Sequence, residues 1–362
     1  MQKESQQSVW KRSRRARAAL ICGLAVFVVG QLALEAAMHT RWPELHDWDF
    51  GEKLKRLQAA MQEEPGQPLV LVLGSSRAAL GVRPDLVPTP VTDGRQPPKV
   101  FNFAFPCFGP VRELVSLRRL LARGVRPDLV IIECWPPFMS RAVAPAEADS
   151  MDLVRAQWGD LQTLRKYSGV PKDLTRRWLE SHCLPCYSDR KALLWNCFGG
   201  VPPALDLGLC RMDSSGGYDW DNRLLDNPAQ DKRRAGYKEM FVPLLGTLTI
   251  SEVANGALRE MLSLCRDRCI PAALLYMPEE SQLRRWYPSH VDTAINAYFT
   301  GLRQEFGVPL IEARDWIRDY RFSDFVHLLP DGAREFTSRL EREAIPGLLE
   351  ESSASRRYAA RR

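Results

Sequence analysis

The sequence contains few of the side chains and motifs that commonly carry metal or nucleotide chemistry. Histidine is scarce, with five in 362 residues, which restricts the choice of a general base. Segment 74–81 has neither the Gly-Lys-Ser/Thr of a phosphate-binding loop nor a Gly-x-Gly-x-x-Gly pattern. No internal repeat is present, and no interior stripe of basic residues alternates with aromatic ones. We therefore expect no cofactor, no metal at a catalytic centre and no nucleic-acid partner.

The formal net charge of +6 at pH 7 does not reverse the conclusion about nucleic acid. Much of the basic excess lies at the two ends of the chain, in segments 11–17 and 356–362. The overall composition, with 45% hydrophobic and 26% charged residues, is that of an ordinary globular protein. A chain of 362 residues can bury one large α/β core or two smaller ones.

One apolar run, Ala18–Leu34, approaches the length needed to cross a membrane. Gln31 interrupts it, and Glu35 closes it. The basic tail 1–17 ahead of it is expected to stay in the cytoplasm, which places the rest of the chain in the periplasm or at the cell surface. We expect an uncleaved anchor in the lipid bilayer over residues 18–38. A cleaved signal peptide is the alternative.

The segment 39–65 that follows is polar and mixed in charge. Leu54, Leu57 and Met61 recur at helical spacing within it and predict a short amphipathic helix. This segment is expected to link the anchor to the main domain.

From Pro68 onward, apolar runs alternate with amphipathic segments. The first run, Leu69–Leu73, is apolar without interruption, which is typical of a buried parallel strand. The alternation implies an α/β domain over residues 66–348, with a parallel sheet covered by helices on both faces and a basic tail after it. The expected strands are 69–73, 99–104, 128–134, 270–277 and 308–312, and the expected helices include 110–123, 251–268, 291–306 and about 331–345.

An insertion over about residues 140–250 separates the third and fourth expected strands, and it is far longer than an ordinary connection in an α/β fold. Its segment Ser214–Asn222 is rich in Gly, Asp and aromatic residues and therefore loop-like. The insertion is either a lid over the functional site or a peripheral subdomain.

Four of the nine cysteines fall in this insertion: Cys183, Cys186, Cys197 and Cys210. Their clustering favours disulfides in an oxidising compartment, and three pairings are possible. A zinc site is the alternative, because His182 precedes Cys183-Leu-Pro-Cys186. We prefer disulfides, since no second Cys-x-x-Cys completes a zinc motif.

A candidate nucleophile follows the first strand. Gly74 permits a sharp turn there, so Ser75 or Ser76 stands at the carboxyl end of the strand and at the start of a helix. In open α/β sheets this edge is where ligands bind. Ser76 is the stronger candidate, and Ser75 is expected to pack or to cap the helix.

A serine nucleophile needs a base, and that base needs a carboxylate to hold its tautomer. His327 is the best candidate, because it follows the fifth strand and precedes the last helix, again at the carboxyl edge. Asp324 lies three residues earlier on the same loop. The other histidines are placed less favourably: His39 and His46 near the apolar run, where we expect surface side chains, His182 among the cysteines, and His290 at a helix start.

These motifs resemble those of the SGNH/GDSL hydrolase superfamily, in which Gly-x-Ser ends the first strand and Asp-x-x-His precedes the last helix. Gly74-Ser75-Ser76 and Asp324-Phe325-Val326-His327 match the two motifs. The resemblance implies a three-layer α/β/α fold with a flavodoxin-like, five-stranded parallel sheet. It also implies that Ser76, His327 and Asp324 are the catalytic triad. The apolar N-terminal run and the Gly-Ser-Ser-Arg form look most like the membrane-anchored acyl-transfer branch, which includes D-alanyl-transfer proteins and polysaccharide O-acetyltransferases.

The chain departs from the family pattern at the oxyanion hole. Cys107 stands near the position of the family's Gly after the second strand, in a segment that begins at Asn102. No Asn follows the third strand, where Cys134-Trp-Pro-Pro-Phe138 replaces Gly-x-Asn-Asp. We expect Cys107, Asn102 and Arg77 near the oxyanion or the substrate, with Arg77 balanced between an anion contact and an ordinary surface charge.

The expected function is that of a membrane-anchored, extracytoplasmic serine acyltransferase or esterase. Its substrates are acyl esters, acetyl-like, of envelope or exported carbohydrate, and the resemblance implies a membrane-bound acyl-donor protein as a partner. One alternative is a catalytically inactive protein of the same fold that binds carbohydrate or acts as a scaffold. Another is a lipase-like esterase at the membrane surface.

Overall fold

The computed structural model describes residues 2–88, 97–169, 173–198, 211–219 and 227–351. The chain divides into two compact units. Unit 1 comprises Met1–Gly51, Asp152–Trp158 and Lys172–Ala204, and unit 2 comprises Glu52–Met151, Gly159–Pro171 and Leu205–Arg362. The long insertion thus contributes to both units.

Unit 2 contains the expected five-stranded parallel sheet. Its strands lie in the order β2-β1-β3-β6-β7, with β1 in register with β2 and β3 at Val72↔Asn102 and Val72↔Ile131. All five predicted strands are confirmed, and β1 has the predicted bounds. The strands are β1 (Leu69–Leu73), β2 (Lys99–Asn102), β3 (Leu129–Glu133), β6 (Ala272–Tyr276) and β7 (Leu310–Glu312).

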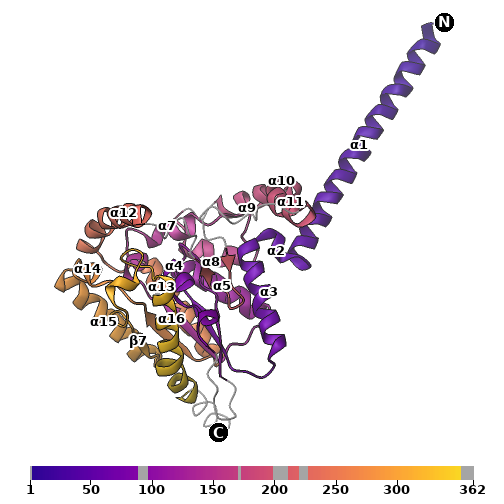
Figure 1. The fold of residues 1–362 in the computed structure, drawn as a ribbon. Helices are drawn as coiled ribbons and strands as arrows, with labels where there is room; N and C mark the ends of the chain where they lie inside the picture. The colour runs from indigo at the N-terminus through magenta and orange to yellow at the C-terminus, as the bar shows by residue number, and fades with distance from the viewer. Residues whose placement is uncertain (1, 89–96, 170–172, 199–210, 220–226, 352–362) are drawn as a thin grey trace. The chain divides into compact units, whose positions relative to one another are not determined.

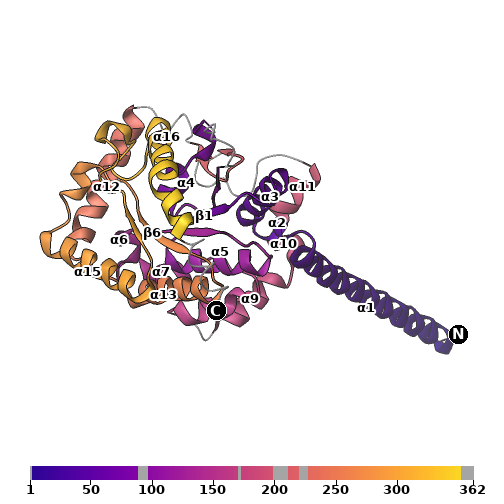
Figure 2. The same cartoon turned by 90° about the horizontal axis from the view of Figure 1, so that it is seen from below.

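Helices cover both faces of this sheet, so the α/β class is also confirmed. Figures 1 and 2 show α4 (Ser76–Gly81) and α16 (Pro330–Arg339) on one face. The other face carries α5 (Pro110–Ala122) and α13 (Glu252–Asp267), which pack on each other. The helix α15 (Ser289–Phe306) packs beside α13 and ends at Gly307, whose φ of 66° is in the left-handed region.

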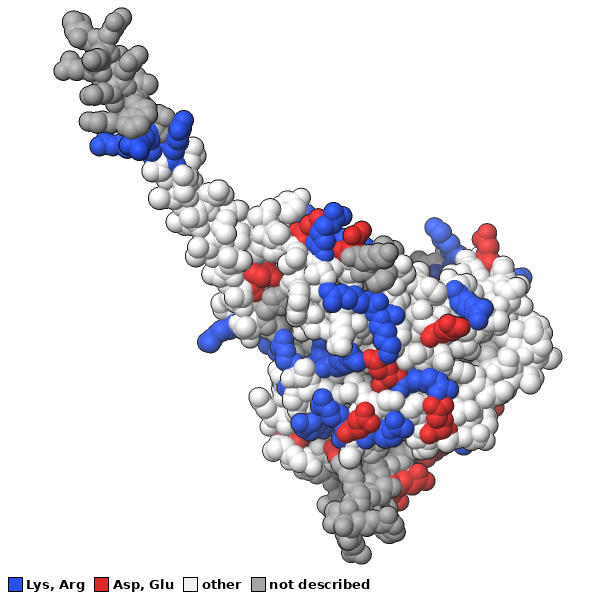
Figure 3. Space-filling model, turned by 180° about the vertical axis from the view of Figure 1, so that it is seen from behind, with Lys and Arg blue, Asp and Glu red and all other residues white. Residues whose placement is uncertain are grey.

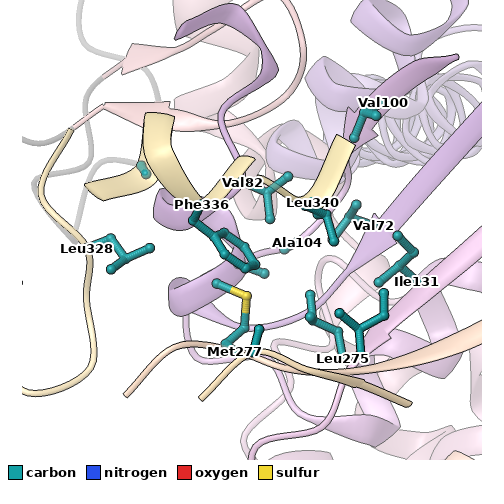
Figure 4. Packing of buried hydrophobic residues seen from close by; sticks show 14 of the residues in the cluster. Val72, Val82, Val100, Ala104, Ile131, Leu275, Met277, Leu328, Phe336 and Leu340 are labelled. Atoms are coloured by element: carbon teal, nitrogen blue, oxygen red, sulfur yellow. The ribbon is translucent and has the colours of Figure 1, made fainter. Parts of the chain in front are cut away.

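The face under α4 and α16 is a continuous apolar core. Alternate residues of the strands point to it, because side chains of a strand alternate between the two faces. Val72, Ile131 and Leu275 meet Phe336 and Leu340 there, as Figure 4 shows. This packing fixes both α4, which begins at Ser76, and α16, which follows the loop of His327. Directly after α16 the chain forms a π-helical turn, Leu340–Ala344.

The part of the insertion in unit 2 contains short helices and a hairpin. Gly216, with φ of 84°, lies in the turn of this hairpin, where an added Cβ would be 2.3 Å from the carbonyl oxygen of Asn102. The Ser215 carbonyl accepts a hydrogen bond from Asn102 N–H at 2.8 Å, so the hairpin lies against β2. The elements are α6 (Pro136–Met139), α7 (Ala144–Asp149), α8 (Asp160–Tyr167), β4 (Arg211–Met212), β5 (Tyr218–Asp219) and α12 (Asn227–Gly246).

Unit 1 begins with α1 (Gln2–Thr40), which carries the apolar run. Within its stretch Arg14–Met38, the most apolar 18 residues have a mean hydropathy of 2.1, and none of them is buried. Figure 3 shows a band of basic side chains on this helix, followed by a stretch without charge. This apolar, exposed helix is either a membrane anchor or a signal sequence. Unit 1 further contains α2 (Pro43–His46), α9 (Leu174–His182), α10 (Pro185–Ser188) and α11 (Arg190–Phe198). The expected amphipathic helix is present as α3 (Trp48–Glu63), which begins in unit 1 and continues into unit 2.

Among the described residues, the cysteines form none of the disulfides that the sequence suggested. Cys183, Cys186 and Cys197 are free and exposed, and every other cysteine in the described ranges is also free. The fourth member of the cluster, Cys210, lies outside the described residues.

The face of the molecule seen in Figure 3 carries basic and acidic side chains intermixed, rather than a patch of one sign.

Candidate active site

The loop after β1 is held tightly against the end of β3. A Cβ at Gly74 would lie 2.6 Å from the Glu133 carboxylate and 2.8 Å from Cβ of Ala78, so only glycine fits. Glu133 accepts hydrogen bonds from the Ser75 N–H (2.7 Å) and hydroxyl (2.9 Å). The Ser75 oxygen in turn accepts from Arg77 N–H at 3.2 Å and caps α4. Ser75 is therefore buried and structural, as predicted, and Ser76 is the hydroxyl left partly exposed at this edge.

The structure brings together the three residues that the sequence analysis selected. The Ser76 hydroxyl oxygen lies 2.8 Å from Nε2 of His327. Nδ1 of the same ring lies 3.0 Å from Oδ2 of Asp324. An acceptor at Nδ1 keeps the proton there, which leaves the Nε2 lone pair facing the hydroxyl. These distances are those of a nucleophile, a base and an orienting carboxylate.

The loop that carries Asp324 and His327 is rigid because its backbone is hydrogen-bonded internally. Oδ1 of Asp324 accepts from the N–H groups of Val326 (2.9 Å) and His327 (2.8 Å). Ser323 N–H donates to the His327 carbonyl at 2.9 Å, which closes the turn. Burial disfavours the charged form of Asp324, but the His327 ring and these N–H groups outweigh burial and lower the pKa of the carboxyl. Asp324 is therefore an anion at neutral pH.

Two expected substrate contacts are structural instead. Arg77 is only 1% exposed, and its guanidinium donates to the carbonyls of Met277 (3.0 Å) and Pro278 (2.8 Å). It also lies 3.6 Å from Glu133 and 3.9 Å from Glu279, so it ties the start of α4 to the end of β3 and to the segment after β6. Because Arg77 is buried, it is neither a contact for a substrate anion nor an ordinary surface charge, and both predictions for it are wrong.

Asn102 is likewise withdrawn from the site. Its side chain is fully buried, and its amide nitrogen donates to the carbonyls of Ala78 and Val82, each at 2.7 Å. Its amide oxygen accepts from Ala104 N–H at 3.0 Å. All these partners are backbone groups, so Asn102 fixes the end of α4 to the segment after β2 and does not face a substrate.

Cys107 lies at the edge where the expectation placed it, and its backbone is unusual. The chain after β2 follows β1, since Phe105 N–H donates to the Gly74 carbonyl at 3.0 Å. Phe108 N–H donates to the Phe105 carbonyl at 3.2 Å, and Cys107 has φ of 61°, as at the third residue of a type II turn. Glycine is preferred at that position, which agrees with the resemblance described above. Neither the Cys107 N–H nor the Ser76 N–H donates to another group in the described chain.

The helix α12 of the insertion contributes residues that the sequence analysis missed. The ring of Tyr237 lies 5.9 Å from that of His327 and 5.4 Å from that of Phe241, which stacks on it. Arg233 Nε lies 3.7 Å from Oδ2 of Asp324. Burial and the nearby charge of Asp324 raise the pKa of Tyr237, so its hydroxyl remains protonated. The four-residue spacing of Arg233, Tyr237 and Phe241, which places them on one helix face, was the available signal.

Another buried carboxyl, that of Glu113, forms no ion pair with any side chain in the described part of the chain. Glu113 on α5 is 3% exposed. Burial, together with the negative charges of Glu133 and Glu147, raises its pKa well above the ordinary value. Burial, together with the nearby carboxyls of Glu113 and Glu133, also raises the pKa of Cys134 well above the ordinary value, which disfavours the reactive thiolate.

Comparison of the chain with protein-family models finds no matching family, and comparison with curated proteins finds no match. Among the described residues, one group of side chains is close enough together to bind a metal ion. It consists of Glu35, His46 and His182 in unit 1, so no such group surrounds Ser76 in the described chain.

Proposed function

We propose that the protein is a serine acyltransferase or esterase of the SGNH type, with Ser76 as nucleophile, His327 as base and Asp324 as the carboxylate that orients it. The observation that carries the proposal is the chain of contacts from the Ser76 hydroxyl through His327 to Asp324, at 2.8 and 3.0 Å. A serine that only capped a helix would need neither contact. Ser75 already supplies the cap of α4.

The reaction follows from these contacts. The Ser76 hydroxyl gives its proton to Nε2 of His327 while its oxygen forms a bond to the acyl carbon of an ester. The ester C–O bond then breaks, and the leaving alcohol takes the proton from His327. In the second half, the hydroxyl of an acceptor gives its proton to Nε2 and its oxygen bonds to the acyl carbon, which releases Ser76. The acceptor is a carbohydrate hydroxyl in a transferase and water in an esterase.

Three donors are available for the negative oxygen that forms during each half. The N–H groups of Ser76 and Cys107 are two of them, and both belong to the same edge of the sheet. We assign the third to the hydroxyl of Tyr237, which stays protonated next to His327. It would replace the Asn that is missing after β3, where Trp135 instead donates its ring N–H to Glu279 at 3.2 Å. One such donor is worth about 3 kcal/mol of transition-state stabilisation.

The substrate class and the location come from the resemblance together with α1. An apolar N-terminal helix kept as an anchor would hold the enzyme at the membrane, with acyl esters of envelope or exported carbohydrate as substrates and a membrane-bound protein as acyl donor. The aromatic side chains Tyr237 and Phe241 of α12 offer an apolar cover that limits the access of water to an acyl-serine, which favours transfer over hydrolysis.

Labelling with a fluorophosphonate tests the proposal directly, because this reagent bonds to an activated serine. The full-length protein in detergent is treated, digested and mapped by mass spectrometry. We expect the label on Ser76, its loss in Ser76→Ala and its retention in Ser75→Ala. The Ser75→Ala variant loses a helix cap and is expected to be less stable by about 1 kcal/mol, which separates stability from reactivity. Labelling that persists in Ser76→Ala contradicts the proposal.

The second candidate function is a catalytically inactive protein of the same fold that binds carbohydrate. The observation in its favour is that Cys134 and Trp135 occupy the place of the family's oxyanion Asn. A wild-type protein that binds envelope glycan but does not react with the fluorophosphonate would support this candidate over the enzyme.

A further inference from the structure

Three side chains from distant parts of unit 1 converge near the end of α1. Glu35 lies in α1, His46 ends α2 and His182 ends α9. The Nε2 atoms of the two histidines are 2.6 Å apart, and Oε1 of Glu35 lies 3.9 Å from Nε2 of His182. All three ligand atoms lie within 4.8 Å of one another. The two imidazoles are 5% and 7% exposed, so the expectation that His46 is a surface residue is wrong.

The outer nitrogen of each ring faces an acceptor. Nδ1 of His182 lies 2.8 Å from the carbonyl oxygen of Trp178. The Ser181 hydroxyl donates to that same carbonyl at 2.8 Å, so the Ser181 oxygen is also an acceptor for Nδ1, at 3.0 Å. Nδ1 of His46 lies 3.3 Å from the Asp189 carboxylate. In the metal-bound arrangement that we consider, both Nδ1 atoms carry the ring protons and both Nε2 atoms present lone pairs.

Two Nε2 lone pairs and a carboxylate that converge in this way can bind a cation placed among them. Ring N–H groups directed at a carbonyl or a carboxylate are the usual outer contacts of histidines that bind a metal through the other nitrogen. Two imidazoles and a carboxylate are a ligand set for Zn²⁺ and for neighbouring divalent transition metals. With bonds of about 2.0–2.1 Å in tetrahedral geometry, the two nitrogens would lie about 3.3 Å apart, so the rings need to separate by less than about 1 Å.

We propose that Glu35, His46 and His182 form a binding site for a divalent transition metal, with Zn²⁺ as the preferred ion. Asp189 orients His46 from the outer side, and the Trp178 carbonyl orients His182. The ring of Trp178 also stacks on that of His182 at 4.1 Å, which fixes the plane of the imidazole. The metal joins α1, α2 and α9, so its role is to pin the end of the apolar helix to the rest of unit 1.

This site replaces the zinc motif that the sequence suggested around His182. That motif relied on Cys183 and Cys186, which are exposed and lie outside the converging group. His182 is paired instead with His46, 136 positions away in the chain. Of the three residues in that sequence motif, the proposed site uses His182 and neither Cys183 nor Cys186.

Metal analysis of the full-length protein tests the site. The protein is purified in detergent through a tag without histidine and in buffers without chelator, dialysed against Zn²⁺ and then against metal-free buffer, and assayed by plasma mass spectrometry. We expect about one Zn²⁺ per chain, because the three residues form a single site. His46→Ala, His182→Ala and Glu35→Gln are expected to lose it, whereas His290→Ala, at an exposed position on α15, keeps it. Asp189→Asn is expected to weaken binding about 10- to 100-fold.

Two further measurements test the site without the histidine variants, which could fail to fold. Co²⁺ titrated into the wild-type protein is expected to give the visible absorption of a tetrahedral site, and EDTA is expected to lower the melting temperature of the wild-type protein but not that of Glu35→Gln. A wild-type protein that retains no Zn²⁺ and gives no Co²⁺ spectrum overturns the proposal. Equal metal content in wild type and His182→Ala also overturns it. In either case the two imidazoles share a proton instead.

Discussion

The hydroxyl oxygen of Ser76 lies 2.8 Å from Nε2 of His327, although 251 positions separate the two residues. The first follows β1 and the second follows β7, and both strands are parallel members of one sheet. Parallel strands end at the same edge, so residues after different strands meet there. The proposed chemistry depends on this contact and on the groups around it.

The first prediction concerns Asp324. In Asp324→Asn, Oδ1 still accepts from Val326 and His327, so the loop keeps its shape. The amide nitrogen that replaces Oδ2 is a donor and forces the Nδ1 proton of His327 to Nε2, where it faces Ser76. We expect the rate of fluorophosphonate labelling, and kcat for an activated acetyl ester, to fall about 10³- to 10⁴-fold.

The control for this change is Asp331→Asn, an exposed carboxylate at the start of α16. It should keep the wild-type rate. An Asp324→Asn variant that stays within tenfold of the wild type would remove Asp324 from the mechanism.

The second prediction concerns Tyr237. Tyr237→Phe removes the hydroxyl but keeps the ring packed against His327 and Phe241. If that hydroxyl donates to the developing oxyanion, kcat falls about 10²-fold, with little change in KM, because the interaction forms only in the transition state. The measurement is steady-state hydrolysis of the same ester. Tyr320→Phe, at a position 65% exposed, is the matched control, and equal kcat values for the two variants would show that Tyr237 only covers the site.

The third prediction uses the raised pKa of Glu113. In the unfolded chain this carboxyl ionises near its ordinary pKa of 4.5, whereas the folded protein holds the proton to higher pH. The unfolded state therefore loses its proton first, and Glu113 lowers the stability of the fold as pH rises above about 4.5. Below that pH the effect vanishes, because both states are protonated.

Glu113→Gln removes this titration and keeps the shape of the side chain. We expect its melting temperature to equal that of the wild type near pH 4 and to exceed it increasingly towards pH 8. Glu335→Gln, at an exposed position on α16, should show no such trend. A melting-temperature difference that does not vary with pH would mean that Glu113 is ionised in the folded protein.

Much of the framework was determined by the sequence alone. The run Leu69–Leu73 is apolar at every position, so both faces of the strand must be removed from water. Its predicted bounds agree with those of β1. The residues Ser76, Asp324 and His327 were also selected from the sequence, because each follows a strand that is strongly patterned. The order of strands and helices then places their loops at one edge of the sheet without knowledge of any contact.

The tertiary structure alone decided which polar groups are buried and with what partners. Arg77 and His46 have the local sequence of surface residues, and each is buried through contacts with segments that are distant in the chain. Tyr237 belongs to an insertion whose pattern predicts helices but not the face on which they pack. Local propensity and periodicity report on neighbours along the chain, whereas the burial of a charge or an imidazole depends on partners that only folding brings near. For that reason the meeting of Ser76, His327 and Asp324 could be predicted, while the aromatic residues beside it, the buried charges near it and the converging histidines could not.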